Sequence, residues 1–174
     1  MTPHEFKKRY ISSIPETPPE LELGLDEFER VEQSELADRP LDPANTEWMS
    51  TVGFPRDAAP FLSFLRPRSQ DTIHGIGEDF YLGHEGSGDA ICIDRVNGSI
   101  VQYDHERMMR KTFVNSSLRQ FAECLCIYQE HSRGSALNGC WEAMCAIDHV
   151  LIEMRGFWWN EIQNELGTRQ SSAS

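Results

Sequence analysis

The 174-residue chain carries 28 acidic and 16 basic residues, and this surplus argues against nucleic-acid binding, because phosphate contacts need a basic surface. Its length and its 39% hydrophobic residues suit one domain with an ordinary core, predicted to span residues 1–166 and to end in a disordered tail at 167–174. No apolar run approaches the roughly 18 residues of a spanning helix, and the first residues lack the apolar stretch of a signal peptide, so we expect a cytoplasmic protein without membrane contact.

The chain opens with the signature of a helix start. Thr2 is a suitable N-cap, Pro3 fits the first helical position, and Glu5 completes a capping box. The proline-rich stretch 14–19 should end this helix, because proline disfavours helix at its own and the preceding position.

A strongly acidic segment follows at 16–47. It holds 11 acidic residues against two arginines, so we expect either a solvated acidic surface or an attraction for basic partners. A second helix should begin at Asp42-Pro43, and Gly53 can take the left-handed position after its end.

Short strands are predicted next, at 61–65, 71–76 and 80–82. The clearest strand signal is a hairpin of residues 90–94 and 99–103, joined across Asn97-Gly98. A four-residue loop over 95–98 would pair Ile93 with Ile100 and Cys92 with Val101, whereas a two-residue loop would set Arg95 against Ile100, and we favour the longer loop.

Helices return in the last third. Asn115, Ser116 and Ser117 are expected to cap a one-sided helix that ends near 132–134. A further helix is predicted at 139–154 and another at 157–166, and Asp148 on a buried face would need a polar partner. Helices, then a sheet, then helices predict an α+β fold with a central antiparallel sheet, a mixed sheet being the alternative.

Two stretches carry a family resemblance. Residues 52–64 read Val-Gly-Phe-Pro-Arg-Asp-Ala-Ala-Pro-Phe-Leu-Ser-Phe, and residues 81–128 contain Gly-Ser-Gly-Asp-Ala-Ile-Cys-Ile-Asp, Tyr-Asp-His-Glu and Val-Asn-Ser-Ser-Leu. These motifs resemble the SUKH superfamily of bacterial immunity proteins, and within it the fourth subfamily in particular. The chain departs from the subfamily pattern at Phe54, Ala90 and His84-Glu85.

The resemblance implies a SUKH-like fold and a protein that binds and neutralises a cognate toxin without catalysis. The toxin would be a nuclease or a nucleic-acid deaminase, blocked by steric and electrostatic occlusion. Two alternatives stay open at this point: a cytosolic regulatory adaptor that binds another protein through the same fold, and a metal-dependent hydrolase.

The candidate contact residues surround the hairpin, where residues 78–106 hold seven acidic residues and one arginine. We expect this negative rim to meet a basic toxin. The candidate partner-binding residues are Glu85, Asp89, Asp94, Tyr103, Asp104, His105 and Glu106.

No catalytic residue, metal or cofactor is predicted from these side chains. The rim could bind a divalent ion in principle, but its spacing fits no zinc or calcium pattern. The five cysteines include no C-x-x-C pair, so we expect reduced thiols.

Overall fold

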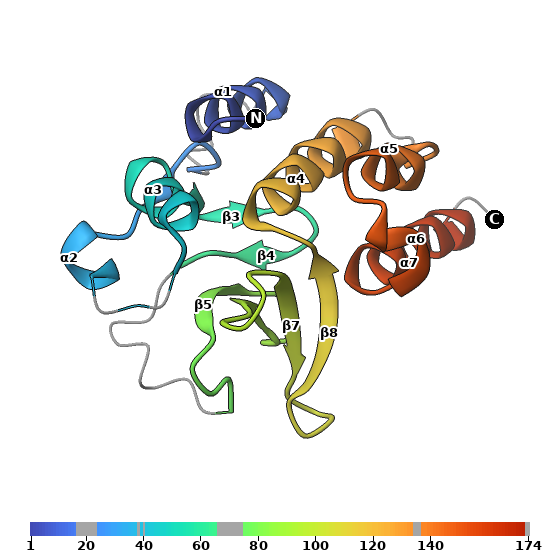
Figure 1. Cartoon of the computed structure of the whole chain (residues 1–174). Coiled ribbons are helices and arrows are strands. Elements are labelled where there is room, and N and C mark those ends of the chain that lie inside the picture. Colours follow the sequence, from blue (N-terminus) through green and yellow to red (C-terminus); the bar gives the residue numbers. More distant parts are fainter. Residues whose placement is uncertain (17–23, 38, 40, 66–74, 134–136, 173–174) are drawn as a thin grey trace.

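The structure, a computed structural model, describes residues 1–16, 24–37, 39, 41–65, 75–133 and 137–172 (Figure 1). The helices are α1 (Pro3–Ser13), α2 (Gln33–Leu36), α3 (Pro43–Thr51), α4 (Leu118–Arg133), α5 (Cys140–Ile147), α6 (Val150–Met154) and α7 (Phe157–Ser172). The strands are β1 (Phe28–Glu29), β2 (Phe54–Pro55), β3 (Asp57–Ala58), β4 (Leu62–Ser63), β5 (Phe80–His84), β6 (Ala90–Ile93), β7 (Ile100–Asp104) and β8 (Arg110–Asn115).

Within the described residues, β3 to β8 form a six-stranded sheet in which each strand pairs with its neighbour along the chain, always antiparallel. The predicted α+β class and the antiparallel sheet are therefore confirmed. The hairpin register is confirmed as well, because Ile93 pairs with Ile100 and Cys92 with Val101. The longer loop lets the apolar faces of both strands coincide.

The other strand predictions hold only in part. β4 covers two residues of the predicted strand 61–65, and Phe61 leaves it by taking a left-handed φ of 55° after a cis Ala59–Pro60 bond. β5 runs two residues past the predicted end, to His84. Residues 71–74 lie outside the described residues, and Gly75 and Ile76 are not in a strand.

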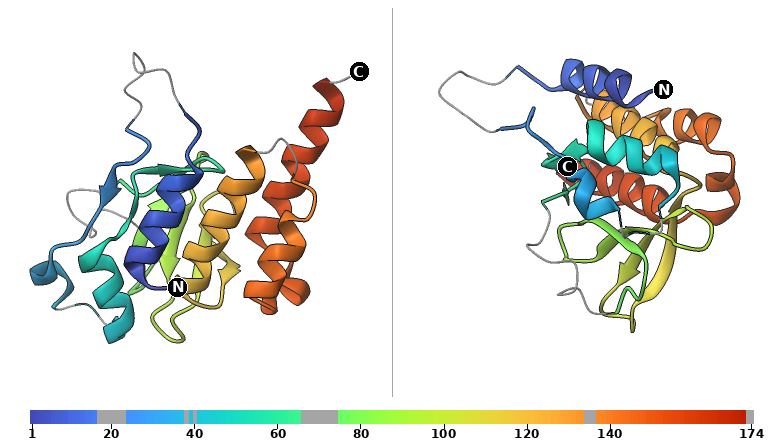
Figure 2. Two further views of the ribbon diagram at one scale, coloured as in Figure 1. Left: turned by 90° about the horizontal axis from the view of Figure 1, so that it is seen from above. Right: turned by 60° about the vertical axis from the view of Figure 1, so that its left-hand side comes forward.

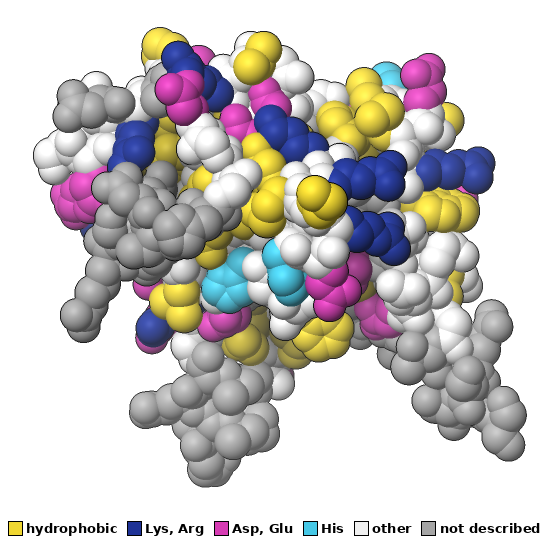
Figure 3. Space-filling model, turned by 90° about the horizontal axis from the view of Figure 1, so that it is seen from below, with side chains coloured by type: hydrophobic (Ala, Val, Ile, Leu, Met, Phe, Trp, Pro, Cys, Tyr) yellow, Lys and Arg dark blue, Asp and Glu magenta, His cyan; other side chains and the backbone are white. Residues whose placement is uncertain are grey.

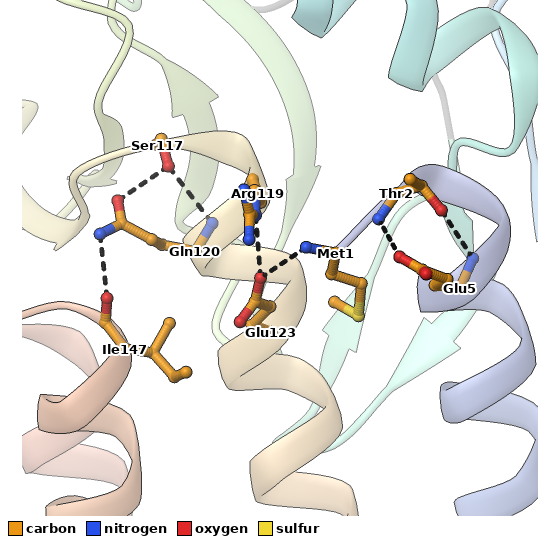
Figure 4. A network of polar contacts seen from close by, with 8 residues as sticks. All are labelled: Met1, Thr2, Glu5, Ser117, Arg119, Gln120, Glu123 and Ile147. Atoms are coloured by element: carbon orange, nitrogen blue, oxygen red, sulfur yellow. Dashed lines mark hydrogen bonds and ion pairs between the residues drawn. The ribbon is translucent and has the colours of Figure 1, made fainter.

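The helix starts follow local side-chain chemistry. The Thr2 hydroxyl accepts from the Glu5 amide at 3.3 Å, the Thr2 amide donates to the Glu5 carboxylate at 2.7 Å, and the capping box is thus confirmed (Figure 4). Asp42 caps α3 by accepting from the Asn45 amide at 2.9 Å. Gly53 follows with φ at 67°, and a Cβ there would lie 1.8 Å from the Glu29 carbonyl oxygen, so only glycine fits.

The helices form one layer on the inner face of the sheet, where α1, α4 and α5 lie side by side (Figure 2). Buried rings connect the two layers: Phe54 lies 5.0 Å from Phe64 and 5.6 Å from Phe121, and Phe121 lies 6.0 Å from Trp158, measured between ring centroids. A smaller apolar cluster forms on the outer face, from Ile76, Tyr81, Ala90, Cys92, Val101 and Tyr103. The described cysteines are all free and buried.

Helix α4 ties the layer together at its first turn. The Met1 amino group lies 3.4 Å from Glu123, which joins the N-terminus to α4 (Figure 4). The Ser117 hydroxyl accepts from the Gln120 amide at 3.3 Å, and the Gln120 side chain donates to the Ile147 carbonyl at 3.1 Å. Ser117 is therefore the residue that caps α4.

The predicted single helix at 139–154 is wrong, because the chain leaves helical geometry at Asp148, with φ −133° and ψ 94°, between α5 and α6. The break aims the 1% exposed Asp148 carboxylate at the end of β8. It also leaves Ile152 of α6 54% exposed.

The Asp148 carboxylate accepts hydrogen bonds from the segment that joins β8 to α4. The Asn115 side chain donates at 3.1 Å, the Ser116 amide at 2.7 Å and the Ser116 hydroxyl at 2.8 Å. Trp158 donates to the Asn115 side-chain oxygen at 2.8 Å. Asn115 and Ser116 are therefore not the helix caps that we expected but the partners that a buried carboxylate requires.

The C-terminal helix also extends further than expected. α7 continues to Ser172, past Gly167, where a tail is predicted. Trp158 is fully buried while Trp159 is half-buried, so these two neighbours face different environments. The acidic segment contributes β1, α2 and the start of α3, and its residues 17–23, 38 and 40 lie outside the described residues.

A protein in which Asp148 is replaced should therefore unfold more easily than the wild type. Asp148→Ala leaves several buried donors unpaired and is expected to lower the free energy of unfolding by about 3 to 5 kcal/mol, with Asp148→Asn intermediate because one acceptor remains. Urea denaturation measures both values. Glu153→Ala, at an exposed position of α6, is the control, and a loss below about 1 kcal/mol for Asp148→Ala would contradict the assignment.

Candidate functional site

Three turns follow one another at one end of the sheet: 59–61 between β3 and β4, 85–89 between β5 and β6, and 105–109 between β7 and β8. They share this end because alternate turns of an antiparallel sheet fall on the same side. A Cβ at Gly86 would lie 3.2 Å from the Cβ of Phe61, and the His105 amide donates to Asp89 at 2.9 Å, so neighbouring turns touch. We call this surface, together with Asp104 at the end of β7, the turn edge.

The structure brings five of the seven candidate residues to the turn edge: Glu85, Asp89, Asp104, His105 and Glu106. They are not equally accessible. Asp89 is only 8% exposed, Glu85 and Asp104 are half-buried, and His105 and Glu106 are exposed.

Asp89 connects two turns of the turn edge through its side-chain contacts. It accepts from the Gln102 side chain at 3.2 Å, from the His105 amide at 2.9 Å and contacts the His105 ring nitrogen Nδ1 at 2.5 Å. The hydrogen bond to Asp89 raises the pKa of His105 above its ordinary value near 6.5. Asp89 thereby holds the loop between β7 and β8 against the turn between β5 and β6.

Side chains also close the turns locally. The Glu85 carboxylate accepts from the Ser87 amide at 3.0 Å and from the Ser87 hydroxyl. The Asp104 carboxylate accepts from the Arg107 amide at 2.9 Å and pairs with the Arg107 guanidinium at 3.5 Å. The turn edge is therefore preformed by its own polar contacts.

The remaining two candidates lie elsewhere. Asp94 follows β6 at the opposite end of the hairpin, where Lys111 binds it at 2.7 Å, and this bond lowers the pKa of Asp94. Tyr103 lies in the outer-face cluster, with its hydroxyl donating to Asp79 at 2.6 Å. Lys111 also contacts Asp79 at 2.8 Å, so one lysine serves two of these carboxylates.

The charge of the hairpin region is consequently mixed. Lys111 and Arg107 pair with Asp79, Asp94 and Asp104, which accounts for much of the acidity counted from the sequence. Figure 3 views the molecule from the side to which the loop between β7 and β8 projects, and it shows Lys and Arg side chains beside acidic ones. The negative charge that remains exposed is therefore limited to a few carboxylates of the turn edge.

Sequence reasoning missed two apolar side chains on the turn edge. Phe61 is 82% exposed and Met108 is 96% exposed, and each has a left-handed φ of 55°. Phe61 was predicted to be a strand residue because it stands in an apolar run.

A groove of about 900 Å³ opens beside Phe61. Its apolar lining comes from the turn between β3 and β4 and from the helical layer, including Ala58, Pro60, Leu62, Tyr10 and Tyr128. Its helical wall also includes Glu161 and Glu165 of α7. Nothing in the sequence pattern placed α7 next to this turn.

The described side chains give little support to catalysis. No group of three or more His, Cys, Asp or Glu residues in the described ranges could hold a metal ion. Burial raises the pKa of Cys126 and of Cys140 to about 12, so these thiols stay protonated at neutral pH and are poor nucleophiles.

Comparison with known proteins identifies a family. A family model for the SUKH-4 immunity protein matches residues 14–157, which is more than four-fifths of the 174-residue chain and includes the whole turn edge. No curated protein and no solved structure matches. In the described part of the chain, no helix has both the length and the apolar character to span a membrane.

The Asp89–His105 contact should make the stability of the protein depend on pH. Because the pKa of His105 is raised in the folded state, its contribution to stability is complete below about pH 6.5 and is lost as the pH rises through the folded pKa. In an NMR titration, Asp89→Asn should return the pKa of His105 toward its ordinary value. Glu106→Gln should lower it less, and an unchanged His105 titration in Asp89→Asn would refute the assignment.

Proposed function

The chain belongs to the SUKH-4 immunity protein family, and we propose that it binds a cognate bacterial toxin and neutralises it by occlusion. The observation that carries the proposal is the family match over residues 14–157. The family supports an immunity role for this chain, and its proteins generally act without catalysis. The class of toxin and the way in which it is blocked are parts of the proposal.

The proposed mechanism is steric and electrostatic. The turn edge would cover the active site or substrate channel of the toxin and exclude its substrate. The hydrogen bonds of Glu85, Asp89 and Asp104 favour this role, because a surface held by internal contacts loses little conformational entropy on binding.

The proposed partner is a basic toxin that acts on nucleic acid, either a nuclease or a deaminase. An enzyme of this kind needs a cationic surface for phosphate groups. The net charge of −12 favours long-range attraction to such a surface and would compete with the negatively charged substrate.

The accessible carboxylates Glu85 and Glu106 would make the electrostatic contacts of the turn edge, whereas Asp104 already pairs with Arg107 and His105 with Asp89. Asp89 would act by holding His105 and its loop in place. Asp94 and Tyr103 lie outside the turn edge, so a toxin that covers only this surface would not need them.

Co-expression tests the function directly. Cells that produce the toxin encoded beside this gene should regain growth when they also produce this protein, because the complex would block the toxin. Growth curves measure the rescue, and an inactive toxin variant shows that arrest comes from toxin activity. Continued arrest despite verified production of both proteins would contradict an immunity function.

Charge reversal tests the electrostatic part. Glu106→Lys should slow association with the toxin about threefold at low salt and less at high salt, because screening weakens steering. Stopped-flow mixing or surface plasmon resonance measures the association rate constant. Glu153→Lys makes the same charge change on α6, outside the turn edge, and an equal effect of both variants would show that net charge alone matters.

A further inference from the structure

The groove beside Phe61 joins the turn edge to the helical layer. One wall is the turn between β3 and β4, with Ala58, Pro60 and Leu62, and the opposite wall comes from α4 and α7, with Tyr128 and Glu161. Its volume of about 900 Å³ is large enough for one or two side chains of a partner. Gly86 of the turn between β5 and β6 also lines it, so the groove is continuous with the turn edge.

Phe61 stands at the mouth of the groove rather than filling it. Its side chain is 82% exposed although the neighbouring Leu62 is only 2% exposed. The left-handed backbone at Phe61 directs consecutive apolar residues apart, one to the core and one to the solvent. An aromatic ring beside a concave apolar surface is the arrangement that dominates the energetics of protein interfaces.

The charged residues that line the groove in the described part of the chain are all acidic. Asp57, Glu161 and Glu165 line it, and none of its described lining residues is Lys, Arg or His. Tyr128 donates its hydroxyl hydrogen to Glu165, which places that carboxylate on the apolar floor.

The Glu161 carboxylate lies in an environment that disfavours its negative charge. Burial raises its pKa, and the negative charges of Glu85 and Glu165 raise it further. Asp57 of β3 and Glu161 of α7 both line the groove, so carboxylates of separate elements border the same space. A cationic side chain between them would offset both the burial and the repulsion.

We propose that this groove receives a basic segment of the toxin, with a lysine or arginine beside Glu161 and an apolar side chain against Phe61. The inference rests on the proposed function and names the part of the surface that anchors the partner. A polypeptide fits better than a small ligand, because Phe61 projects out of the groove, where an enclosed ligand could not reach its exposed face. The exposed acids of the turn edge would guide the approach, and the groove would hold the complex together.

Binding kinetics with the purified, inactive toxin encoded beside this gene test the assignment. Phe61→Asn removes the ring while keeping a residue that tolerates positive φ, and it should raise the dissociation rate constant about tenfold. Glu161→Gln removes the charge and should raise that rate constant about fivefold, since a cation would lose its partner. Neither change should lower the melting temperature, because Phe61 is exposed and Glu161 is repelled by its neighbours.

Val96→Asn is a matched control, because Val96 is also an exposed apolar residue, at 91%, but it lies in the loop between β6 and β7, at the opposite end of the sheet from the turn edge. Together with Glu153→Gln, it should change the dissociation rate constant less than about twofold. Wild-type dissociation rates in both groove variants would overturn the groove assignment while leaving the immunity function in place. If the wild-type protein itself shows no binding, the proposed function falls, and the groove assignment falls with it.

Discussion

The buried carboxylate of Asp148 is the contact on which the arrangement of the C-terminal half depends. It accepts hydrogen bonds from Asn115 and Ser116, and Asn115 in turn accepts from Trp158. These four residues belong to the end of β8, the entry into α4, the break between α5 and α6, and α7. A carboxylate at 1% exposure is stable only where such donors converge, so the fold has to bring these segments together around Asp148.

The position of the groove follows from this constraint. With α7 held against the end of β8 by Trp158, the later turns of α7 bring Glu161 and Glu165 beside α4 and the turn between β3 and β4. Gly156 permits the close approach that precedes α7, because a Cβ there would lie 2.1 Å from the Phe113 carbonyl oxygen. The network at one end of α7 thus fixes the acidic wall of the groove, although none of its members lines that groove.

Sequence reasoning succeeded where the determining interaction is local. The capping box joins Thr2 and Glu5, which lie three positions apart, and the hairpin register at Ile93 and Ile100 follows from a short loop and an apolar pattern. It failed where a distant partner decides the outcome. The Asp148 carboxylate interrupts a helical pattern because of donors more than thirty residues away, and Phe61 turns outward because the chain reverses there instead of continuing a strand. Among the candidate residues, Asp89 and His105 meet because they flank the paired strands β6 and β7 at the same end, whereas Asp94 lies at the opposite end of this hairpin.

The contacts of each carboxylate, and not only their number, decide how an acidic protein can recognise a basic one. Counting carboxylates along the hairpin overstates the charge available to a partner, because Lys111 and Arg107 already pair with Asp79, Asp94 and Asp104. Carboxylates that are paired internally stabilise turns and add little to long-range attraction, whereas unpaired and partly buried ones, such as Glu161, gain most from a new cation. Net charge can then set how fast partners meet, while the few carboxylates next to an exposed aromatic ring set how long they stay together. For the proposed basic toxin, specificity is therefore expected from the shape around Phe61 rather than from the overall charge.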